Sequence, residues 1–354
     1  MGVSEVTGAG VRAGGQVDRW TGGRRLRRGV ARFALALALP FGAAFGQTHL
    51  VIVSGLGGEA KYTASFASLS QALADAANKR FGIAAAEIQW FGEDSVSKKP
   101  FFKGQSTKTN VDRAMAQLAA RAAATDQIVL VLIGHGSGQG PDSKISIPGP
   151  DLGAADFAQM LAKFPTQKVA FIDMTSASGD MLPFISAPNR VVITATKSGF
   201  ERNESHFAQF FIDALSKDVA DTDKDGRVSL LEAFRYAVTE TKRLYDTDTR
   251  IQTEHAQLDD IGAKAGVPDP DGRTSQGVLA RRFFLDGGIS TTAANDPQLA
   301  ALYKDKFALE DQIDQLRRKK STMTSDAYDD ALETLLVQLA RKAKTIRELE
   351  GRKS

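Results

Sequence analysis

The chain has 354 residues, and its hydrophobic fraction of 42% and charged fraction of 25% are those of an ordinary globular protein, which excludes a disordered or fibrous one. It contains no cysteine, which excludes a disulfide framework, a thiolate metal site and a cysteine nucleophile. The first 46 residues hold seven Lys or Arg and two Asp or Glu, so the remainder has 38 positive and 40 negative side chains, a net charge of −2 that favours neither a nucleic-acid nor an anionic-membrane partner.

Residues 1–46 have the pattern of a secretory signal peptide. Arg24–Arg28 is a basic cluster, Phe33–Pro40 is a short apolar segment, and Ala44 and Gly46 supply small residues before a cleavage point. The apolar segment is too short for a stable transmembrane helix, and an uncleaved anchor is the alternative. We therefore expect a periplasmic or secreted protein of the bacterial envelope, with no membrane span in the mature chain.

From Thr48 onward the chain alternates between segments that predict strands and segments that predict helices. Apolar runs predict buried strands at His49–Val53, Glu87–Phe91, Gln127–Ile133, Lys168–Asp173 and Arg190–Ala195. Amphipathic segments predict helices at Tyr62–Arg80, Asn110–Ala124 and Ala154–Lys163, and Asn110 and Asp151 are candidate helix starts. This alternation predicts a three-layer α/β/α domain with a mostly parallel sheet, in which functional groups gather at the carboxyl ends of the strands.

The remaining chain is predominantly helical by the same criterion. Ser205–Val219 and Leu230–Tyr245 predict two helices around an acidic loop. In residues 297–350 apolar side chains recur at 3-4 spacing on both sides of Ser321–Ser325, which predicts an antiparallel helical hairpin with a coiled-coil seam. Packing on the main domain and self-association are both open as its role. The predicted divisions are a signal peptide (1–46), an α/β domain (47–288) and the hairpin (289–354).

Two of the predicted strand ends carry candidate catalytic groups. His135 and Gly136 follow the strand Gln127–Ile133, and Ser176 lies in the small-residue turn after Lys168–Asp173. Because glycine lets the backbone turn sharply, His135 can lie in the cleft as a base. Ser176 is then the candidate nucleophile, and backbone N–H groups near Gly136 and Ser176 are candidate oxyanion donors. A structural histidine in an ordinary turn is the alternative.

These segments resemble the legumain and caspase superfamily (peptidase clan CD), and notably its legumain type, C13. Those enzymes have an apolar strand that ends in His-Gly and a later strand that ends in Ala-Cys, often followed by Glu-Ser-Gly. Leu132–Ser137 is similar to the first block and Phe171–Met181 to the second, and the resemblance covers roughly residues 48–250. It implies a caspase-like fold and a peptidase-like hydrolase scaffold, with Ser176 at the position of the catalytic cysteine.

The exchange of cysteine for serine weakens the expectation of catalysis. A cysteine thiol is partly ionised near neutral pH, whereas a serine hydroxyl needs a well-placed base that a third group usually orients. Acidic residues near predicted strand ends are candidates to orient His135: Glu59, Glu93 and Asp94. Ser178 and Thr175 offer further hydroxyl groups. The other histidines have no partner at metal-ligand spacing and are expected to be structural or solvated: His49, His206 and His255.

Residues 221–232 have the complete pattern of an EF-hand calcium loop, between two predicted helices. Aspartates occupy the first, third and fifth positions: Asp221, Asp223 and Asp225. Gly226 makes the sharp turn, Arg227 offers its backbone carbonyl, Ser229 can hold a water molecule, and Glu232 closes the site with both carboxylate oxygens. Calcium is therefore the expected cofactor, and a loop that keeps its shape without a metal is the alternative.

Together these features predict an exported, catalytically impaired peptidase scaffold that acts as a calcium-stabilised binding module. Its expected partner is a peptide or another protein, with the C-terminal hairpin as a candidate surface for self-association. The alternative is an active serine-type hydrolase that transfers acyl groups from peptides through Ser176 and His135.

Overall fold

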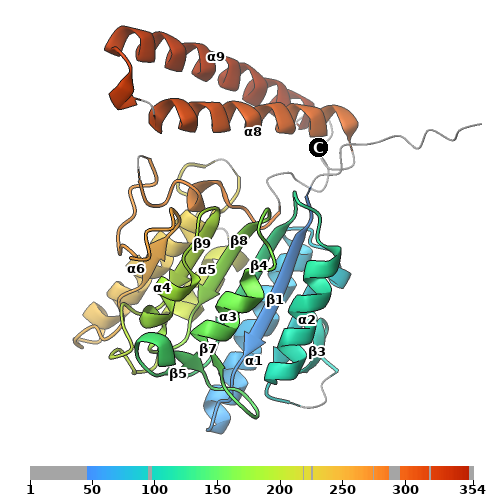
Figure 1. Cartoon of the computed structure of the whole chain (residues 1–354), viewed down its shortest axis with the longest axis vertical. Coiled ribbons are helices and arrows are strands. Elements are labelled where there is room, and N and C mark those ends of the chain that lie inside the picture. Colours follow the sequence, from blue (N-terminus) through green and yellow to red (C-terminus); the bar gives the residue numbers. More distant parts are fainter. Residues whose placement is uncertain are drawn as a thin grey trace, which may run out of the picture. The chain divides into compact units, whose positions relative to one another are not determined.

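The structure, a computed structural model, describes residues 46–94, 98–217, 219–224, 226–273, 275–286, 296–318 and 320–350. The predicted signal peptide lies outside these residues except for Gly46. Seven strands form one sheet in the order β10-β9-β8-β4-β1-β2-β3 (Figure 1), and every neighbouring pair is parallel except β9 with β10. The strands are β1 (Thr48–Ser54), β2 (Ile88–Gly92), β3 (Phe102–Gln105), β4 (Gln127–Ile133), β8 (Lys168–Asp173), β9 (Arg190–Thr194) and β10 (Gln257–Asp259).

A smaller antiparallel sheet and the helices complete the fold. The small sheet directly follows β4 and consists of β5 (Gly136–Ser137), β6 (Lys144–Ile145) and β7 (Leu152–Gly153). The helices of the α/β region are α1 (Ala60–Lys79), α2 (Lys108–Arg121), α3 (Ala154–Leu161), α4 (Leu182–Ile185), α5 (Phe207–Ser216) and α6 (Leu230–Thr247).

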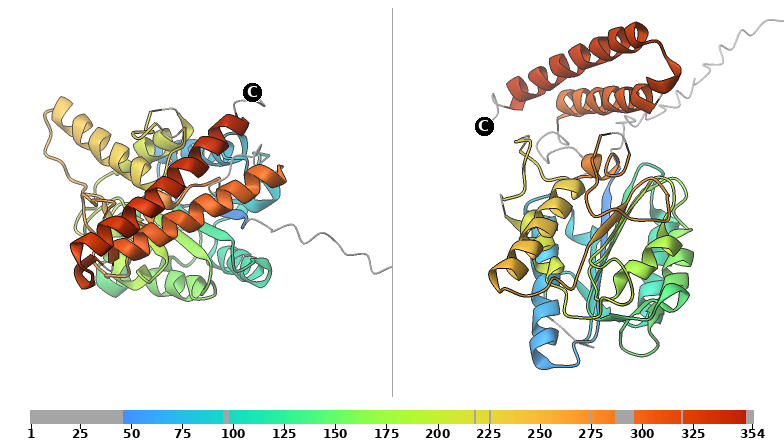
Figure 2. Two further views of the ribbon diagram at one scale, coloured as in Figure 1. Left: turned by 90° about the horizontal axis from the view of Figure 1, so that it is seen from above. Right: turned by 90° about the vertical axis from the view of Figure 1, so that its left-hand side faces the viewer.

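Helices cover both faces of the large sheet, as the edge-on view in Figure 2 shows. Helices α1, α5 and α6 pack on one face, and α2, α3 and α4 pack on the other. Every residue of β4 is buried. Its alternate side chains enter opposite cores, with Val129 in the first and Leu130 in the second. Burial on both faces explains why this strand is a continuous apolar run, and the predicted three-layer α/β fold is confirmed.

Two predicted helix starts are wrong. Helix α2 is capped by Thr107, whose hydroxyl accepts a hydrogen bond from the Asn110 N–H at 3.3 Å. Helix α3 begins after Gly153, and the Asp151 carboxylate is engaged elsewhere, accepting from the Ile147 N–H and pairing with a lysine of β6. Asparagine and aspartate are both good helix caps, but Thr107 is the residue that caps α2 and Gly153 is the residue that precedes α3.

Helices α8 (Pro297–Arg318) and α9 (Ser325–Glu350) form the C-terminal hairpin. Leu299 and Tyr303, near the start of α8, are buried against Ile346, near the end of α9, so the two helices are antiparallel. Lys342 of α9 also pairs with Asp305 of α8. Within the described ranges, no helix combines the length and the apolar composition required to cross a membrane.

A charged network ties together the amino ends of three strands. The buried ring of His49, at the start of β1, lies between Glu87 (2.5 Å from Nδ1) and Asp126 (2.9 Å from Nε2). Asp126 also accepts hydrogen bonds from the backbone N–H groups of Gln47 and Ala123 at 2.8 Å each. Burial alone would raise the pKa of Asp126, but these hydrogen bonds and the histidine outweigh burial and lower the pKa below 3.8.

We expect Asp126→Asn to lower the free energy of unfolding at pH 7 by about 2–4 kcal/mol, because it leaves buried donors without their charged acceptor. A lowered pKa means that this contribution is present above pH 3.8 and is lost as pH falls through the lower, folded-state value. Urea unfolding at pH 7, 5 and 3 checks both statements. The control is Asp75→Asn, because Asp75 is a partly exposed partner of Lys79 on α1. A loss of unfolding free energy in Asp75→Asn as large as that in Asp126→Asn would contradict the assignment.

Candidate functional site

The two candidate catalytic turns lie side by side at the carboxyl edge of the sheet. Strands β4 and β8 are parallel neighbours with Leu132 opposite Asp173. The N–H of Met174, just beyond β8, donates to the carbonyl of Leu132 at 3.0 Å. His135 therefore leaves β4 close to the point where Ser176 leaves β8.

The hydroxyl of Ser176 is bound to the backbone of Gly136. It accepts a hydrogen bond from the Gly136 N–H at 3.2 Å and is within donating distance of the Gly136 carbonyl at 3.3 Å. Ser176 is only 4% exposed. The side chains of His135 and Ser176 are both described, and no hydrogen bond joins them. The N–H expected to serve as an oxyanion donor is thus occupied by the candidate nucleophile itself.

Gly136 is required for a reason other than the expected sharp turn. The backbone of Gly136 does not have a positive φ, so its conformation does not itself require glycine. A Cβ at this position would instead lie 2.1 Å from the carbonyl oxygen of Ser176 and 2.6 Å from the hydroxyl oxygen of Thr175. Close approach of the two turns therefore excludes a side chain here.

His135 packs against aromatic rings of α1. Its imidazole meets Tyr62 edge-on, with the ring centres 4.7 Å apart, and Phe66 in the same manner at 5.1 Å. Among the described residues, none of the acidic candidates accepts a hydrogen bond from His135. Glu93 instead accepts from the Gly57 N–H at 3.1 Å and the Thr63 hydroxyl at 2.8 Å, and Glu59 pairs with a lysine at the start of α1.

The two alternative hydroxyls, Thr175 and Ser178, are also buried and already hydrogen-bonded. Ser178 shares a hydrogen bond with the Thr196 hydroxyl at 3.2 Å and accepts another from the Thr196 N–H. Thr175 donates to Asp173 at 2.6 Å. These contacts hold the turn after β8 in place.

Asp173 is a fully buried carboxyl group at the end of β8. One carboxylate oxygen accepts hydrogen bonds from the Thr175 hydroxyl and N–H, while the other, Oδ2, has no hydrogen-bond partner among the described residues. Burial disfavours the charged form and raises the pKa of Asp173 to about 7, although the Thr175 hydrogen bonds oppose the shift. A group three residues from Ser176 therefore changes charge near neutral pH.

Sequence reasoning missed an acid–histidine pair close to this turn. The ring Nδ1 of His255, a residue for which no role was predicted, lies 2.5 Å from the Glu201 carboxylate. The backbone N–H of His255 donates to the same carboxylate at 3.0 Å. The Glu201 carbonyl accepts from the Ala177 N–H at 2.7 Å, directly after Ser176. Because 54 residues separate His255 from Glu201, no local spacing signals the pair.

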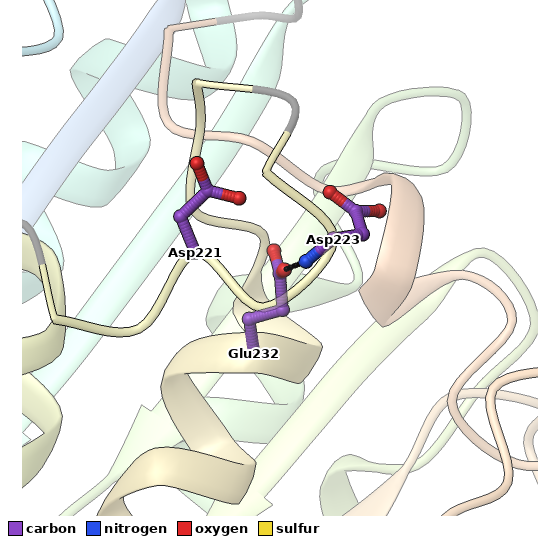
Figure 3. Close-up of side chains that lie close together, drawn as sticks. All are labelled: Asp221, Asp223 and Glu232. Atoms are coloured by element: carbon purple, nitrogen blue, oxygen red, sulfur yellow. Dashed lines mark hydrogen bonds between the residues drawn. The ribbon is translucent and has the colours of Figure 1, made fainter.

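The candidate calcium ligands gather on the loop between α5 and α6 and on the first turn of α6 (Figure 3). Asp221, Asp223 and Glu232 each bring a carboxylate oxygen within 4.8 Å of the others. Asp225 lies outside the described residues. Two oxygens on opposite sides of a calcium ion, each about 2.4 Å from it, would be about that far apart, so the spacing fits the ion.

Hydrogen bonds shape this loop around Glu232 and Asp221. The Glu232 carboxylate accepts from the N–H and hydroxyl of Ser229 and of Thr222, which closes a capping box at the start of α6. Burial would raise the pKa of Glu232, but these hydrogen bonds outweigh burial and lower it, so the group is ionised. Asp221 accepts from the Gly226 N–H at the turn.

Arg227, which is expected to offer its backbone carbonyl to the ion, also carries a positive charge that would oppose a cation. Its guanidinium instead forms two hydrogen bonds with Asp286, at 2.7 and 3.2 Å, and stacks on the Phe284 ring. Asp286 neutralises the arginine locally, so little of its charge is left to oppose a cation.

No protein-family model and no curated protein matches the chain. Among solved structures, it is similar to drICE, with a TM-score of 0.38 and 9% identity, over 61% of this chain and 87% of that one. It is also similar to the Drosophila initiator caspase Dronc, with a TM-score of 0.40 and 12% identity, over 69% of this chain and 84% of that one. Similarity this distant does not establish a family.

We expect Asp173→Asn to remove a pH dependence of stability between about pH 4 and pH 7. The Asp173 carboxyl group binds a proton more tightly in the folded chain than in the unfolded one, so its own contribution to stability is highest at low pH and falls as pH rises toward the folded-state pKa of about 7. The fall is at most about 1.4 kcal/mol per pH unit from this group. Thermal unfolding of both proteins across this range, with Asp75→Asn as the matched control, checks the result; parallel curves for wild type and Asp173→Asn would contradict it.

Proposed function

We propose that this chain is a peptidase-like α/β scaffold that binds a peptide or protein partner and does not hydrolyse it. The observation that supports this most strongly is the pair of contacts between the Ser176 hydroxyl and the Gly136 backbone. Acyl transfer to a serine hydroxyl requires the hydroxyl proton to pass to a base as the oxygen attacks the carbonyl carbon. Here the hydroxyl lies within donating distance of the Gly136 carbonyl. No hydrogen bond joins it to His135, although both side chains are described.

The surroundings of His135 favour the same conclusion. A catalytic histidine is usually oriented by an acidic group on its other ring nitrogen. His135 is held by ring contacts with Tyr62 and Phe66, and the acid–imidazole pair of this region belongs to His255 and Glu201. The rings of Tyr62 and Phe66, the His135 imidazole and the turn after β8 can contact a bound peptide without performing chemistry on it.

An active serine-type hydrolase is the second candidate. It is favoured by the placement of His135 and Ser176 after neighbouring strands. In many enzymes the hydrogen bond between nucleophile and base is long in the free protein and shortens when the substrate binds. The resemblance to clan CD peptidases, with serine at the cysteine position, is compatible with either function.

We expect no Ser176-dependent adduct when the wild type is treated with a fluorophosphonate or with a peptide acyl probe. Ser176→Ala is the comparison, Ser178→Ala is the matched control within the same turn, and intact-protein mass spectrometry is the measurement. An adduct present in the wild type and in Ser178→Ala but absent from Ser176→Ala would establish the hydrolase instead.

Because the chain has no cysteine, Ser176→Cys contains a single thiol. Cleavage of peptides by this variant but not by the wild type would show that the serine hydroxyl is the reason the wild type is inactive, and that the rest of the site can support hydrolysis. A wild type that cleaves peptides contradicts the proposal.

We further propose that the loop between α5 and α6 holds one calcium ion. Asp221, Asp223 and Asp225 would supply single oxygens and Glu232 would supply two, with the Arg227 carbonyl and a water molecule held by Ser229 completing the set. The carboxylate spacing, the ionised Glu232 and the neutralised Arg227 support this. A bound ion would brace the junction of two helices that pack on the sheet.

We expect calcium to raise the melting temperature of the wild type, and Asp221→Asn to abolish both this shift and the heat of calcium binding. At a free calcium concentration 100 times the Kd, the stabilisation is about 2.7 kcal/mol. Asp213→Asn is the control, because Asp213 is an acidic residue of α5 that pairs with Lys217 outside the loop. Equal calorimetric heats for wild type and Asp221→Asn would rule out the loop as the site.

Export to the bacterial periplasm or exterior is part of the same proposal. A single calcium loop suits a structural role in a calcium-rich compartment, and the pattern of residues 1–46 supports export. Self-association through α8 and α9 is the proposed role of the hairpin, whose helices carry apolar side chains along their length.

A further inference from the structure

The segment Phe283–Asp286, called the strap below, connects the calcium loop to the sheet. The N–H of Leu230, at the start of α6, donates to the Phe283 carbonyl at 2.9 Å. Phe284 forms an antiparallel backbone bridge with the residue that precedes α6. On the other side, the amide of Gln127, at the start of β4, donates to the Phe284 carbonyl at 3.0 Å. The strap therefore links the beginning of α6 to the amino end of a central strand.

The side chain of Arg227 holds the strap from within the calcium loop. Its guanidinium donates two hydrogen bonds to the Asp286 carboxylate and lies 3.7 Å from the centre of the Phe284 ring. A pair of parallel hydrogen bonds fixes geometry as well as charge. The side chains of Arg227 and Asp286 are only 15% and 14% exposed, so water screens this ion pair far less than it screens a pair on the surface.

The main chain of Arg227 has a separate role in the proposed calcium site. Arg227 occupies the seventh position of the loop 221–232, where an EF-hand takes its ligand from a backbone carbonyl. One residue therefore offers its carbonyl to the ion and its guanidinium to the strap. Asp286 lies outside the loop and outside the group of described carboxylates that are close enough to share a metal ion. Its effect on the ion is exerted through Arg227, whose positive charge would otherwise repel a cation.

We propose that Asp286 is a positioning residue for calcium, and that calcium binding and docking of the strap are coupled through Arg227. The inference rests on the proposed calcium site. A docked strap neutralises the guanidinium and restrains the Arg227 backbone, which favours binding of the ion. A bound ion fixes the Arg227 carbonyl, which favours docking of the strap. Because such coupling is reciprocal, each event strengthens the other by the same factor.

Calorimetric titration of the full-length protein with calcium tests the effect of the strap on the ion. Asp286→Asn removes the charge at nearly constant size, and we expect it to raise the Kd for calcium about 5-fold, the lower end of typical coupling between sites. Arg227→Gln removes the guanidinium and keeps the backbone carbonyl. In that background Asp286→Asn should leave the Kd unchanged, whereas an Asp286 charge that acted directly on the ion would weaken binding in both backgrounds.

Hydrogen exchange measured by mass spectrometry tests the effect of the ion on the strap. Saturating calcium should slow exchange in a peptide that contains the strap in the wild type, and it should not do so in Asp286→Asn. A carboxylate that merely stabilised the strap would lower protection in the variant and leave the response to calcium intact. Asp246→Asn is the matched control, because Asp246 is an acidic residue of α6 that pairs with Lys242. This control should behave as the wild type in both measurements.

The possible results separate the coupling from the calcium site itself. If the wild type gives no heat with calcium, the calcium site and the coupling are both wrong. If the wild type binds calcium, an unchanged Kd in Asp286→Asn or a strap whose exchange ignores calcium overturns the coupling alone. Should Asp286→Asn fail to fold, Arg227→Gln decides by hydrogen exchange, since it should bind calcium without slowing exchange in the strap.

Discussion

The contact between the backbone of Gly136 and the turn that follows β8 is the constraint on which the site depends. Hydrogen bonding of β4 to β8 brings the two chain segments together, and the missing side chain at Gly136 lets them touch. The same approach places the Ser176 hydroxyl between the N–H and the carbonyl of Gly136. The hydroxyl at this site is therefore bound to backbone and shares no hydrogen bond with His135.

Acidic side chains serve different purposes at different places in this fold. At Asp126 and Glu232 the protein supplies enough donors to keep a buried carboxylate ionised, which fixes strand starts and a helix start. At Asp173 the donors are too few, and burial prevails. The carboxyl group that bonds Thr175 in the turn before Ser176 therefore changes charge near neutral pH.

Much of the fold was predictable because its central strands are buried on both faces. Gln127–Ile133 and Lys168–Asp173 appear with the predicted bounds. The short strands β3, β5, β6, β7 and β10 were not predicted, because segments of two to four residues are too short to show a hydrophobic pattern. The order of the turns predicted that His135 and Ser176 lie close together, but not how the hydroxyl is bonded. Pairing of His255 with Glu201 depends on packing between distant segments, which spacing along the chain cannot indicate.

The His49 network and the Ser176 turn lie at opposite ends of the same sheet. Strand β4 has seven residues, which separates the two ends by about 20 Å. Effects of substitutions this far apart, without shared partners, are usually additive. Residues at the Ser176 end of the sheet can therefore be exchanged without weakening the charged network around His49 at the other end. This separation lets residues at the Ser176 end of the sheet change during evolution while the stability that the His49 network contributes is kept.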